Sequence, residues 1–188
     1  MSKFAVALAC KLAFVTGATT AAALTPIEHF AELPFLERPL LSPDGNSIAA
    51  TVNADGQQTL VIYSLDPNNK SFHKISAGDG DINWWRWVND DWLVAGIGQV
   101  QYANDTKIYV SRLIRISSNG KIVKVVGSPK GQDGDNLLWA ARDGSPKILY
   151  SYQDSIYSEK NFFPRVSKFD VATGSQITVA DPIENVFN

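Results

Sequence analysis

The segment Asp79–Gly98 reads DGDINWWRWVNDDWLVAGIG, and its pattern indicates the fold of the rest of the chain. Three tryptophans lie within four residues, at Trp84, Trp85 and Trp87, and a second apolar run covers residues 92–97. A short Asn-Asp-Asp break separates the two runs. Aromatic and β-branched residues on both sides of such a break predict two strands joined by a tight turn.

Similar units lie on both sides of this segment. Turns of one kind recur with spacings of 46 and 53 residues, and they contain Asp44, Asp90 and Asp143. Turns of a second kind recur with spacings of 51 and 53 residues, and they begin at Asp66, Ser117 and Asp170. A four-stranded unit that repeats every 40 to 50 residues or so is typical of a β-propeller blade. A β-sandwich is the alternative, but it would not repeat the order of turn types three times.

We therefore expect an all-β fold, namely an incomplete β-propeller of about three four-stranded antiparallel blades preceded by a signal-peptide helix. The blades are expected at about residues 39–78, 79–131 and 132–182, after a proline-containing connector at 24–38. Propellers close with roughly four to eight blades, so three leave the ring open. The apolar side chains in 183–188 indicate the first strand of a further blade. We expect the chain to be the N-terminal part of a larger protein or a truncated product.

The N-terminus differs in composition from the rest of the chain. Lys3 is followed by an apolar stretch at residues 4–15, interrupted only by Lys11, and then by small residues at 16–23. This order predicts a secretory signal peptide, residues 1–23, and hence an exported protein that is periplasmic or secreted. An amphipathic helix of the folded domain is the alternative. The stretch is too short and too interrupted for a membrane span, which needs about 20 apolar residues.

Composition and cysteine content bear on which classes of protein the chain can belong to. The chain has 188 residues, a net charge of −2 and 19% charged residues, so it lacks the basic excess of a nucleic-acid-binding domain. Cys10 is its only cysteine, and cleavage of the signal peptide would remove it. The mature chain would then depend on its core alone, without disulfides. Acylation of Cys10, as in a lipoprotein, is an alternative.

Catalytic and metal chemistry find little support in the residues. The two histidines, His29 and His73, are far apart and are not expected to face a serine or to complete a zinc site. Four aspartates that open the second and third units suggest calcium, but no late glutamate accompanies them and we interpret them as turn formers. They are Asp79, Asp81, Asp133 and Asp135. We expect no catalytic residue, no metal and no cofactor.

The tryptophan cluster has two interpretations: packing between blades, which we favour, or an aromatic surface for a peptide or sugar. Neighbouring residues of a strand face opposite sides, so Trp84 and Trp85 should diverge while Trp85 and Trp87 share a side. Peptide contacts are expected instead in two loops, at residues 99–105 and 157–163, because loops on a rigid scaffold carry specificity. The candidate contact residues in these loops are Tyr102, Asn104, Tyr157 and Phe162.

Three segments carry a family resemblance. Residues 42–45 (SPDG) followed by 48–50 (IAA), residues 87–94 (WVNDDWLV) and residues 166–174 (VSKFDVATG) are similar to propeller repeats of known exported proteins. The likeness is to bacterial members of the prolyl oligopeptidase family of serine peptidases, which includes dipeptidyl and acylaminoacyl peptidases. The resemblance covers about residues 30–188. It indicates the propeller more specifically than it indicates the catalytic domain.

The resemblance implies that the propeller covers an α/β-hydrolase domain and limits which peptides reach the catalytic serine. That domain would lie downstream, and this sequence contains neither a Gly-x-Ser-x-Gly elbow nor two adjacent glutamates to hold a substrate amino terminus. The expected function is therefore that of a non-catalytic propeller segment of an exported serine peptidase. Its partners would be the hydrolase domain and peptide substrates. A stand-alone periplasmic propeller that binds a protein or peptide is the alternative, and an inactive remnant is a third possibility.

Overall fold

The structure is a computed structural model that describes residues 36–54, 57–68 and 70–181. Within these residues the chain forms twelve β-strands and one short helix, α2 (Glu159–Phe162). The predicted signal peptide, residues 24–35 of the connector and the apolar residues 183–188 lie outside the described ranges. No helix in the described part has the length and hydropathy needed to cross a membrane.

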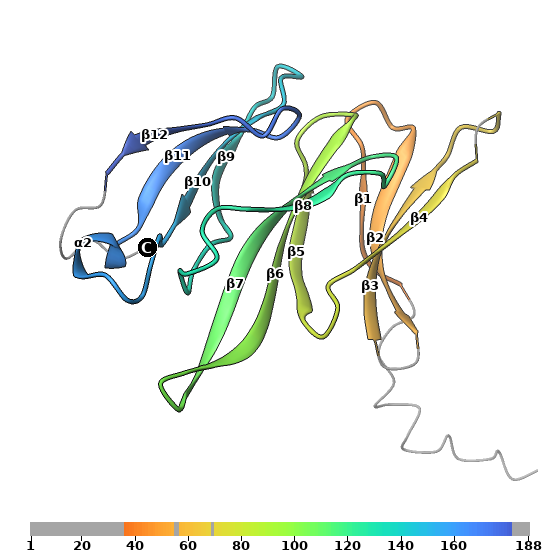
Figure 1. The fold of residues 1–188 in the computed structure, drawn as a ribbon. Coiled ribbons are helices and arrows are strands. Elements are labelled where there is room, and N and C mark those ends of the chain that lie inside the picture. Colours follow the sequence, from red (N-terminus) through yellow and green to blue (C-terminus); the bar gives the residue numbers. More distant parts are fainter. Residues whose placement is uncertain (1–35, 55–56, 69, 182–188) are drawn as a thin grey trace, which may run out of the picture. The chain divides into compact units, whose positions relative to one another are not determined.

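The strands form three open four-stranded antiparallel sheets that follow one another along the chain (Figure 1). The first sheet contains β1 (Leu36–Leu41), β2 (Ser47–Ala54), β3 (Gln57–Ser64) and β4 (Phe72–Ser76). The second contains β5 (Asp81–Trp87), β6 (Trp92–Ala103), β7 (Thr106–Ser117) and β8 (Val123–Val126). The third contains β9 (Asn136–Ala140), β10 (Lys147–Tyr152), β11 (Arg165–Asp170) and β12 (Gln176–Ala180). The prediction of an all-β fold with three four-stranded antiparallel sheets is confirmed.

The first strand starts earlier than the sequence predicted. β1 begins at Leu36, inside the expected connector, and its pairing with β2 is interrupted by a bulge between Glu37 and Leu40. Pro39 lies in this bulge, and Arg38 has a positive φ of 49°. A proline has no N–H to donate, so an edge strand with a bulge is a place where a sheet tolerates it.

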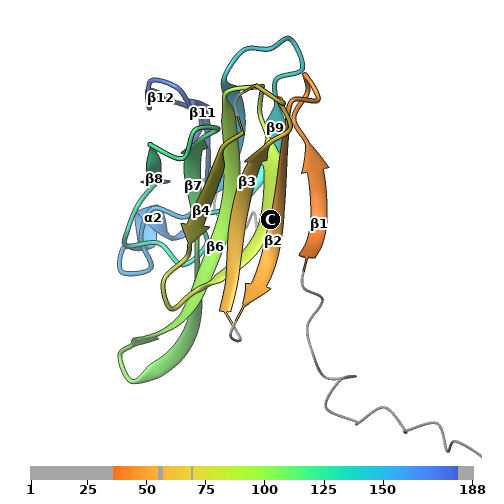
Figure 2. The same cartoon turned by 90° about the vertical axis from the view of Figure 1, so that its right-hand side faces the viewer.

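The largest local departure concerns residues 99–105, which were expected to form a polar loop. β6 and β7 pair without interruption from Trp92↔Ser117 to Ala103↔Thr106, so the segment extends a hairpin past its neighbours (Figure 2). The turn itself consists of Asn104 and Asp105, with φ values of 47° and 62°. Two consecutive positive φ values define the turn that best matches the twist of paired strands, and Asn and Asp tolerate it.

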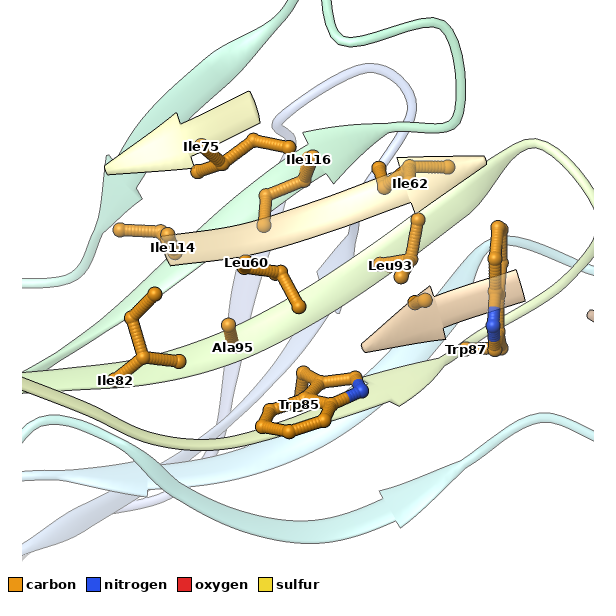
Figure 3. Close-up of a cluster of buried hydrophobic side chains, with 11 residues drawn as sticks. Leu60, Ile62, Ile75, Ile82, Trp85, Trp87, Leu93, Ala95, Ile114 and Ile116 are labelled. Atoms are coloured by element: carbon orange, nitrogen blue, oxygen red, sulfur yellow. The ribbon is translucent and has the colours of Figure 1, made fainter. Parts of the chain in front are cut away.

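Two hydrophobic clusters join the sheets face to face. The first cluster lies between the first and second sheets and includes Leu60 and Ile62 on one side and Leu93 and Ile116 on the other (Figure 3). The second cluster lies between the second and third sheets, where Val94, Leu113 and Val126 meet Ile148, Tyr150 and Phe169. The middle sheet is thus covered on both faces. Full burial of each such side chain stabilises the fold by about 1.5–3 kcal/mol.

The tryptophans of β5 pack between the sheets, and they face the sides that the alternation of the strand predicted. Trp85 and Trp87 belong to the first cluster, whereas Trp84 packs against the second. The Trp87 indole N–H donates to the carbonyl of Leu40 at 3.1 Å, and that of Trp84 donates to Asp135 Oδ2 at 3.0 Å. Two of the three rings therefore tie neighbouring sheets together as well as filling space between them.

The three sheets share one register. Ile48 pairs with Tyr63, Leu93 with Ile116 and Ile148 with Phe169 at equivalent places. The turn after the third strand of each sheet is closed by a backbone hydrogen bond from Ser64, Ser117 or Asp170. In the first sheet this turn therefore begins two residues before Asp66, the residue predicted from the sequence, because its loop is longer.

Candidate functional site

Residues 128–135 connect the second sheet to the third and are hydrogen-bonded to both. On one side the Ser111 N–H of β7 donates to the carbonyl of Gln132 at 2.8 Å. On the other side the Gln153 N–H, just after β10, donates to the carbonyl of Asp133 at 2.7 Å. The segment is thus hydrogen-bonded to both sheets, and its polar groups lie along the junction between them.

Arg112 holds this segment in place from β7. Its half-buried guanidinium group donates hydrogen bonds to the carbonyls of Pro129 at 2.8 Å, Gly131 at 2.7 Å and Gln132 at 3.3 Å, and also to that of Ser111. Burial lowers the pKa of Arg112, and the nearby Asp133 carboxylate acts in the opposite direction. The planar fork of donors suits arginine to this task, since one lysine ammonium cannot reach as many separated acceptors.

The loop after β10 is hydrogen-bonded to the same segment. Gln153 Nε2 donates to the carbonyl of Phe162 at 2.7 Å, while its Oε1 accepts the Gln132 N–H at 2.7 Å. The Ser128 hydroxyl donates to the carbonyl of Asp154 at 2.5 Å. Gln153 therefore fixes the position of α2 relative to the connection between the sheets.

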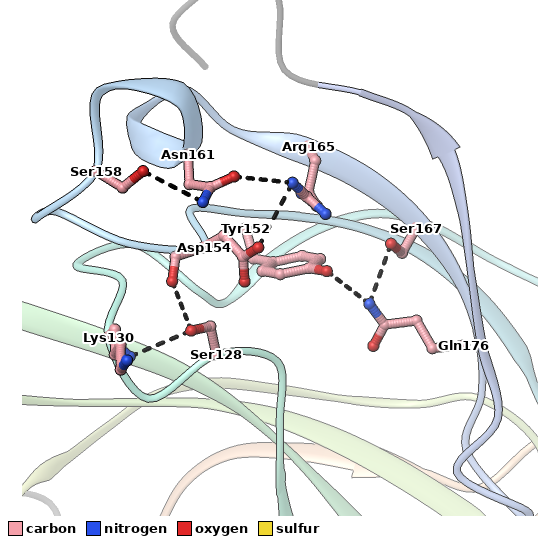
Figure 4. A network of polar contacts seen from close by, with 9 residues as sticks. All are labelled: Ser128, Lys130, Tyr152, Asp154, Ser158, Asn161, Arg165, Ser167 and Gln176. Carbon is pink, nitrogen blue, oxygen red and sulfur yellow. Dashed lines mark hydrogen bonds and ion pairs between the residues drawn. The ribbon is translucent and has the colours of Figure 1, made fainter.

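A second group of polar contacts closes the loop on β11, as Figure 4 shows. Arg165 lies 3.5 Å from the Asp154 carboxylate and donates to Asn161 Oδ1 at 3.3 Å. At the other end of the group Gln176 Nε2 donates to the Tyr152 hydroxyl at 2.7 Å. Arg165 of β11 thus holds the loop that carries α2 at two points, Asp154 near its start and Asn161 in the helix.

Two hollows border this loop and share Phe162. The larger, of about 730 Å³, is lined by Ile156, Tyr157, Ser158, Glu159, Lys160, Phe162 and Phe163. The smaller, of about 350 Å³, is lined by Gln132, Asp133, Asp135, Asn136, Ser151, Tyr152, Gln153, Phe162 and Pro164. Tyr157 is 67% exposed, so a large aromatic surface faces solvent at the mouth of the larger hollow. Such aromatic surface is suited to contact with a partner.

The smaller hollow is acidic. Loss of hydration raises the pKa of the Asp133 carboxyl, the neighbouring Asp135 carboxylate raises it further, and Arg112 opposes both effects. Two carboxylates at one mouth favour cationic groups, although Asp135 already accepts a hydrogen bond from Trp84. Chemically, the arrangement offers aromatic contact in one hollow and hydrogen-bond acceptors in the next.

The structure brings together two of the four predicted contact residues. Tyr157 and Phe162 line the same hollow. Tyr102 and Asn104 lie at the far end of the β6–β7 hairpin, where Tyr102 is 74% exposed and Asn104 forms the turn. The two predicted loops therefore belong to different elements, and one of them is a hairpin.

Sequence reasoning missed Arg112 and Gln153, and it treated Asp133 and Asp135 as turn formers. A signal for Arg112 was present: it is a cation that interrupts a mainly apolar strand, next to Leu113 and Ile114, which are buried. Gln153 had no comparable signal, because a polar residue after a strand is ordinary. Its role depends on two segments that approach each other only in the folded chain.

In residues 36–54, 57–68 and 70–181, no group of three or more His, Cys, Asp or Glu side chains is placed to hold a metal ion. Comparison with known proteins gives no family: no protein-family model matches the chain, and no curated protein matches it at a significant level. The resemblance to the prolyl oligopeptidase family therefore stays a prediction.

Proposed function

We propose that this chain is a non-catalytic β-propeller segment of an exported serine peptidase, with a role in peptide gating and in support of a hydrolase domain. The observation that carries the proposal is the stacking of three sheets in one register through two clusters of the same kind. Face-to-face repetition of four-stranded sheets is the packing of propeller blades. The peptidase assignment draws on the sequence resemblance alone.

The region around α2 is the best candidate for peptide contact. It combines the exposed ring of Tyr157 with Phe162, and it lies next to the polar hollow that contains Asp133 and Gln153. Peptides offer apolar side chains and backbone donors, which such a pair of hollows can accept. The anchoring contacts of Gln153 and Arg165 keep the aromatic residues in place, which reduces the entropy lost on binding.

Hydrolysis tests the non-catalytic part of the proposal. The purified chain is incubated with chromogenic aminoacyl and dipeptidyl substrates and separately with a fluorophosphonate reagent that labels active serines. We expect no turnover above the blank and no labelled serine. Turnover that the reagent abolishes would contradict the proposal.

Peptide binding tests the site. We expect Tyr157→Ala and Phe162→Ala each to weaken binding of a fluorescent peptide pool by roughly tenfold, since a buried aromatic contact contributes about 1–2 kcal/mol. Tyr102→Ala is the matched control, because it removes the same ring at the hairpin tip. A loss confined to Tyr102→Ala would place binding on the hairpin and contradict the site at α2.

The second candidate function, a stand-alone propeller that binds a protein or peptide, is favoured by the outer face of the third sheet. Ile177 there is 69% exposed and Trp139 is 46% exposed, so apolar side chains from two strands of this face are in contact with solvent. Exposed apolar surface of this kind marks a contact with another protein.

A further inference from the structure

The two end sheets of the stack each expose a row of side chains that crosses all four strands. In the third sheet the row is Trp139, Leu149, Lys168 and Ile177, which we call the leading row. In the first sheet the row is Leu41, Ile48, Tyr63 and Phe72, which we call the trailing row. Both rows are mainly apolar.

Each row has an equivalent that is packed inside the stack. Tyr63 of the trailing row is 36% exposed, whereas Ile116 and Phe169, at the same register position of the second and third sheets, are 0% and 4% exposed. Leu149 of the leading row is half-buried, and its equivalents Ala49 and Val94 are fully buried. The free rows are thus the two halves of one more junction of the kind that the molecule already contains twice.

Charge distinguishes this junction from a generic apolar contact. Arg115, in the second sheet, donates to the carbonyls of Val171 at 2.7 Å and Ala172 at 2.9 Å, which belong to a turn of the next sheet. Lys168 occupies the position of Arg115 in the third sheet. Each lies two residues before the residue whose N–H closes the turn, which is Ser117 after Arg115 and Asp170 after Lys168. In the first sheet the positions of Val171 and Ala172 are held by Leu65 and Asp66. If the two free rows met as the inner sheets do, Lys168 would therefore face a turn of the first sheet that contains the anion Asp66.

The opposite turns repeat this complementarity. Asn89 Nδ2 donates to the carbonyl of Gly144 at 2.9 Å, which joins the second sheet to the third. Arg142 holds the position of Asn89 in the third sheet, and Gly45, with a φ of 75°, holds that of Gly144 in the first. Gly45 follows Asp44, whose carboxyl pKa is lowered by hydrogen bonds from Ser42 and Asn46. A second cation thus corresponds to a second turn with an anion.

We propose that the leading row of one copy of this chain binds the trailing row of a second copy, with Lys168 at Asp66 and Arg142 at Asp44. Two copies joined twice in this way bring together six of the sheets that the structure describes, within the roughly four to eight that close a propeller. The contact is heterologous, so it closes into a pair only where the rotation allows and otherwise gives open chains. This contact follows from the repeated packing and from the charges at the turns, and it does not require a hydrolase domain. A closed pair would favour the stand-alone function.

Sedimentation of the purified chain with exchanged charges tests the contact. We expect the chain to associate at micromolar concentration, and Lys168→Glu and Asp66→Lys each to weaken association at least about tenfold, because each places like charges together. The double variant K168E/D66K restores the pair and should associate as the original chain does. An equimolar mixture of the two single variants should also associate, since both of its junctions then join opposite charges.

Lys107→Glu is the matched control, because it makes the same charge change on the exposed β6–β7 hairpin and should leave association unchanged. Each variant is first compared with the original chain by circular dichroism, and the rescue in the double variant excludes misfolding as the cause. A monomer at all concentrations overturns the proposal. So does association that K168E leaves intact, or a longer natural product in which a further sheet of the same chain covers Ile177.

Discussion

Arg112 supports the junction between the second and third sheets by holding the segment that connects them. Its guanidinium group serves four carbonyls, three of them in residues 129–132, a segment with no strand of its own. Buried carbonyls without a donor are costly, so the arginine stabilises the segment by satisfying several at once.

Replacement of Arg112 by methionine should lower the free energy of unfolding by roughly 2–4 kcal/mol, because several hydrogen bonds from a charged donor are lost and three of their four acceptors stay partly buried. Arg112→Lys should recover only part of this. Urea denaturation followed by tryptophan fluorescence measures both. Lys107→Met, on the exposed hairpin, should change stability by less than about 0.5 kcal/mol. Equal effects at the two positions would refute the role of Arg112.

Asp133 makes stability depend on pH in a defined direction. Its pKa in the folded chain lies above the ordinary value because of lost hydration and the nearby Asp135 carboxylate. A carboxyl with a raised folded pKa costs no stability while it is protonated, and the cost appears as pH rises through and above its unfolded value of 3.8. Asp133→Asn should therefore raise the unfolding midpoint at pH 7 and leave it nearly unchanged at pH 3. A midpoint that falls at pH 7 would contradict this.

Individual side-chain directions were predictable where a strand alternates. The opposed faces of Trp84 and Trp85 follow from strand geometry alone, and the structure confirms them. The hydrogen-bond partners of Trp87 and Trp84 were not predictable, because Leu40 and Asp135 lie 47 and 51 positions away in the chain. Short-range pattern carries no information about which distant group meets an indole N–H.

At the level of elements, turns make direct contact between sheets. Gly120, in the turn between β7 and β8, has a φ of 67°, and a Cβ atom placed on it would lie 2.8 Å from His73 Cβ of the first sheet. His73 is thus half-buried against a neighbouring turn. The turn needs glycine for two reasons: its backbone has a positive φ, and His73 leaves no room for a Cβ atom.

The matched pair Gly120→Ala and Gly144→Ala separates these two reasons. Both glycines have a positive φ, but a Cβ atom on Gly144 meets nothing within 4 Å. Gly144→Ala should cost about 1 kcal/mol for backbone conformation alone, and Gly120→Ala should cost at least about 1 kcal/mol more. Thermal unfolding of the two variants measures the difference. Equal costs would mean that His73 does not pack against the turn.

The hairpin β6–β7 shows where element prediction failed. Gln99 and Gln101 alternate with Val100 and Tyr102, but all four are exposed, so no buried face marks the segment as strand. The pairing continues because the partner strand β7 has matching length and the Asn104-Asp105 turn suits the twist. Alternation that is solvent-exposed on both faces gives a weak sequence signal.

At the scale of the whole molecule, the number and order of sheets were predictable because the turns repeat. Three sheets of four strands follow from three copies of two turn types, and the structure contains them. The junctions between sheets were not predictable, since they depend on Arg112, on the connecting segment 128–135 and on the two hydrophobic clusters. The candidate site at α2 lies next to such a junction, but Tyr157 and Phe162 belong to a single loop, which is why the sequence could place them together.

A crystal structure of the purified chain is the most direct measurement of the central claim, that three separate sheets stack in one register. We expect three open four-stranded sheets, with Trp87 bonded to the carbonyl of Leu40 and Asn89 to that of Gly144 across the two junctions. A single closed barrel, or two sheets packed as a sandwich, would contradict it.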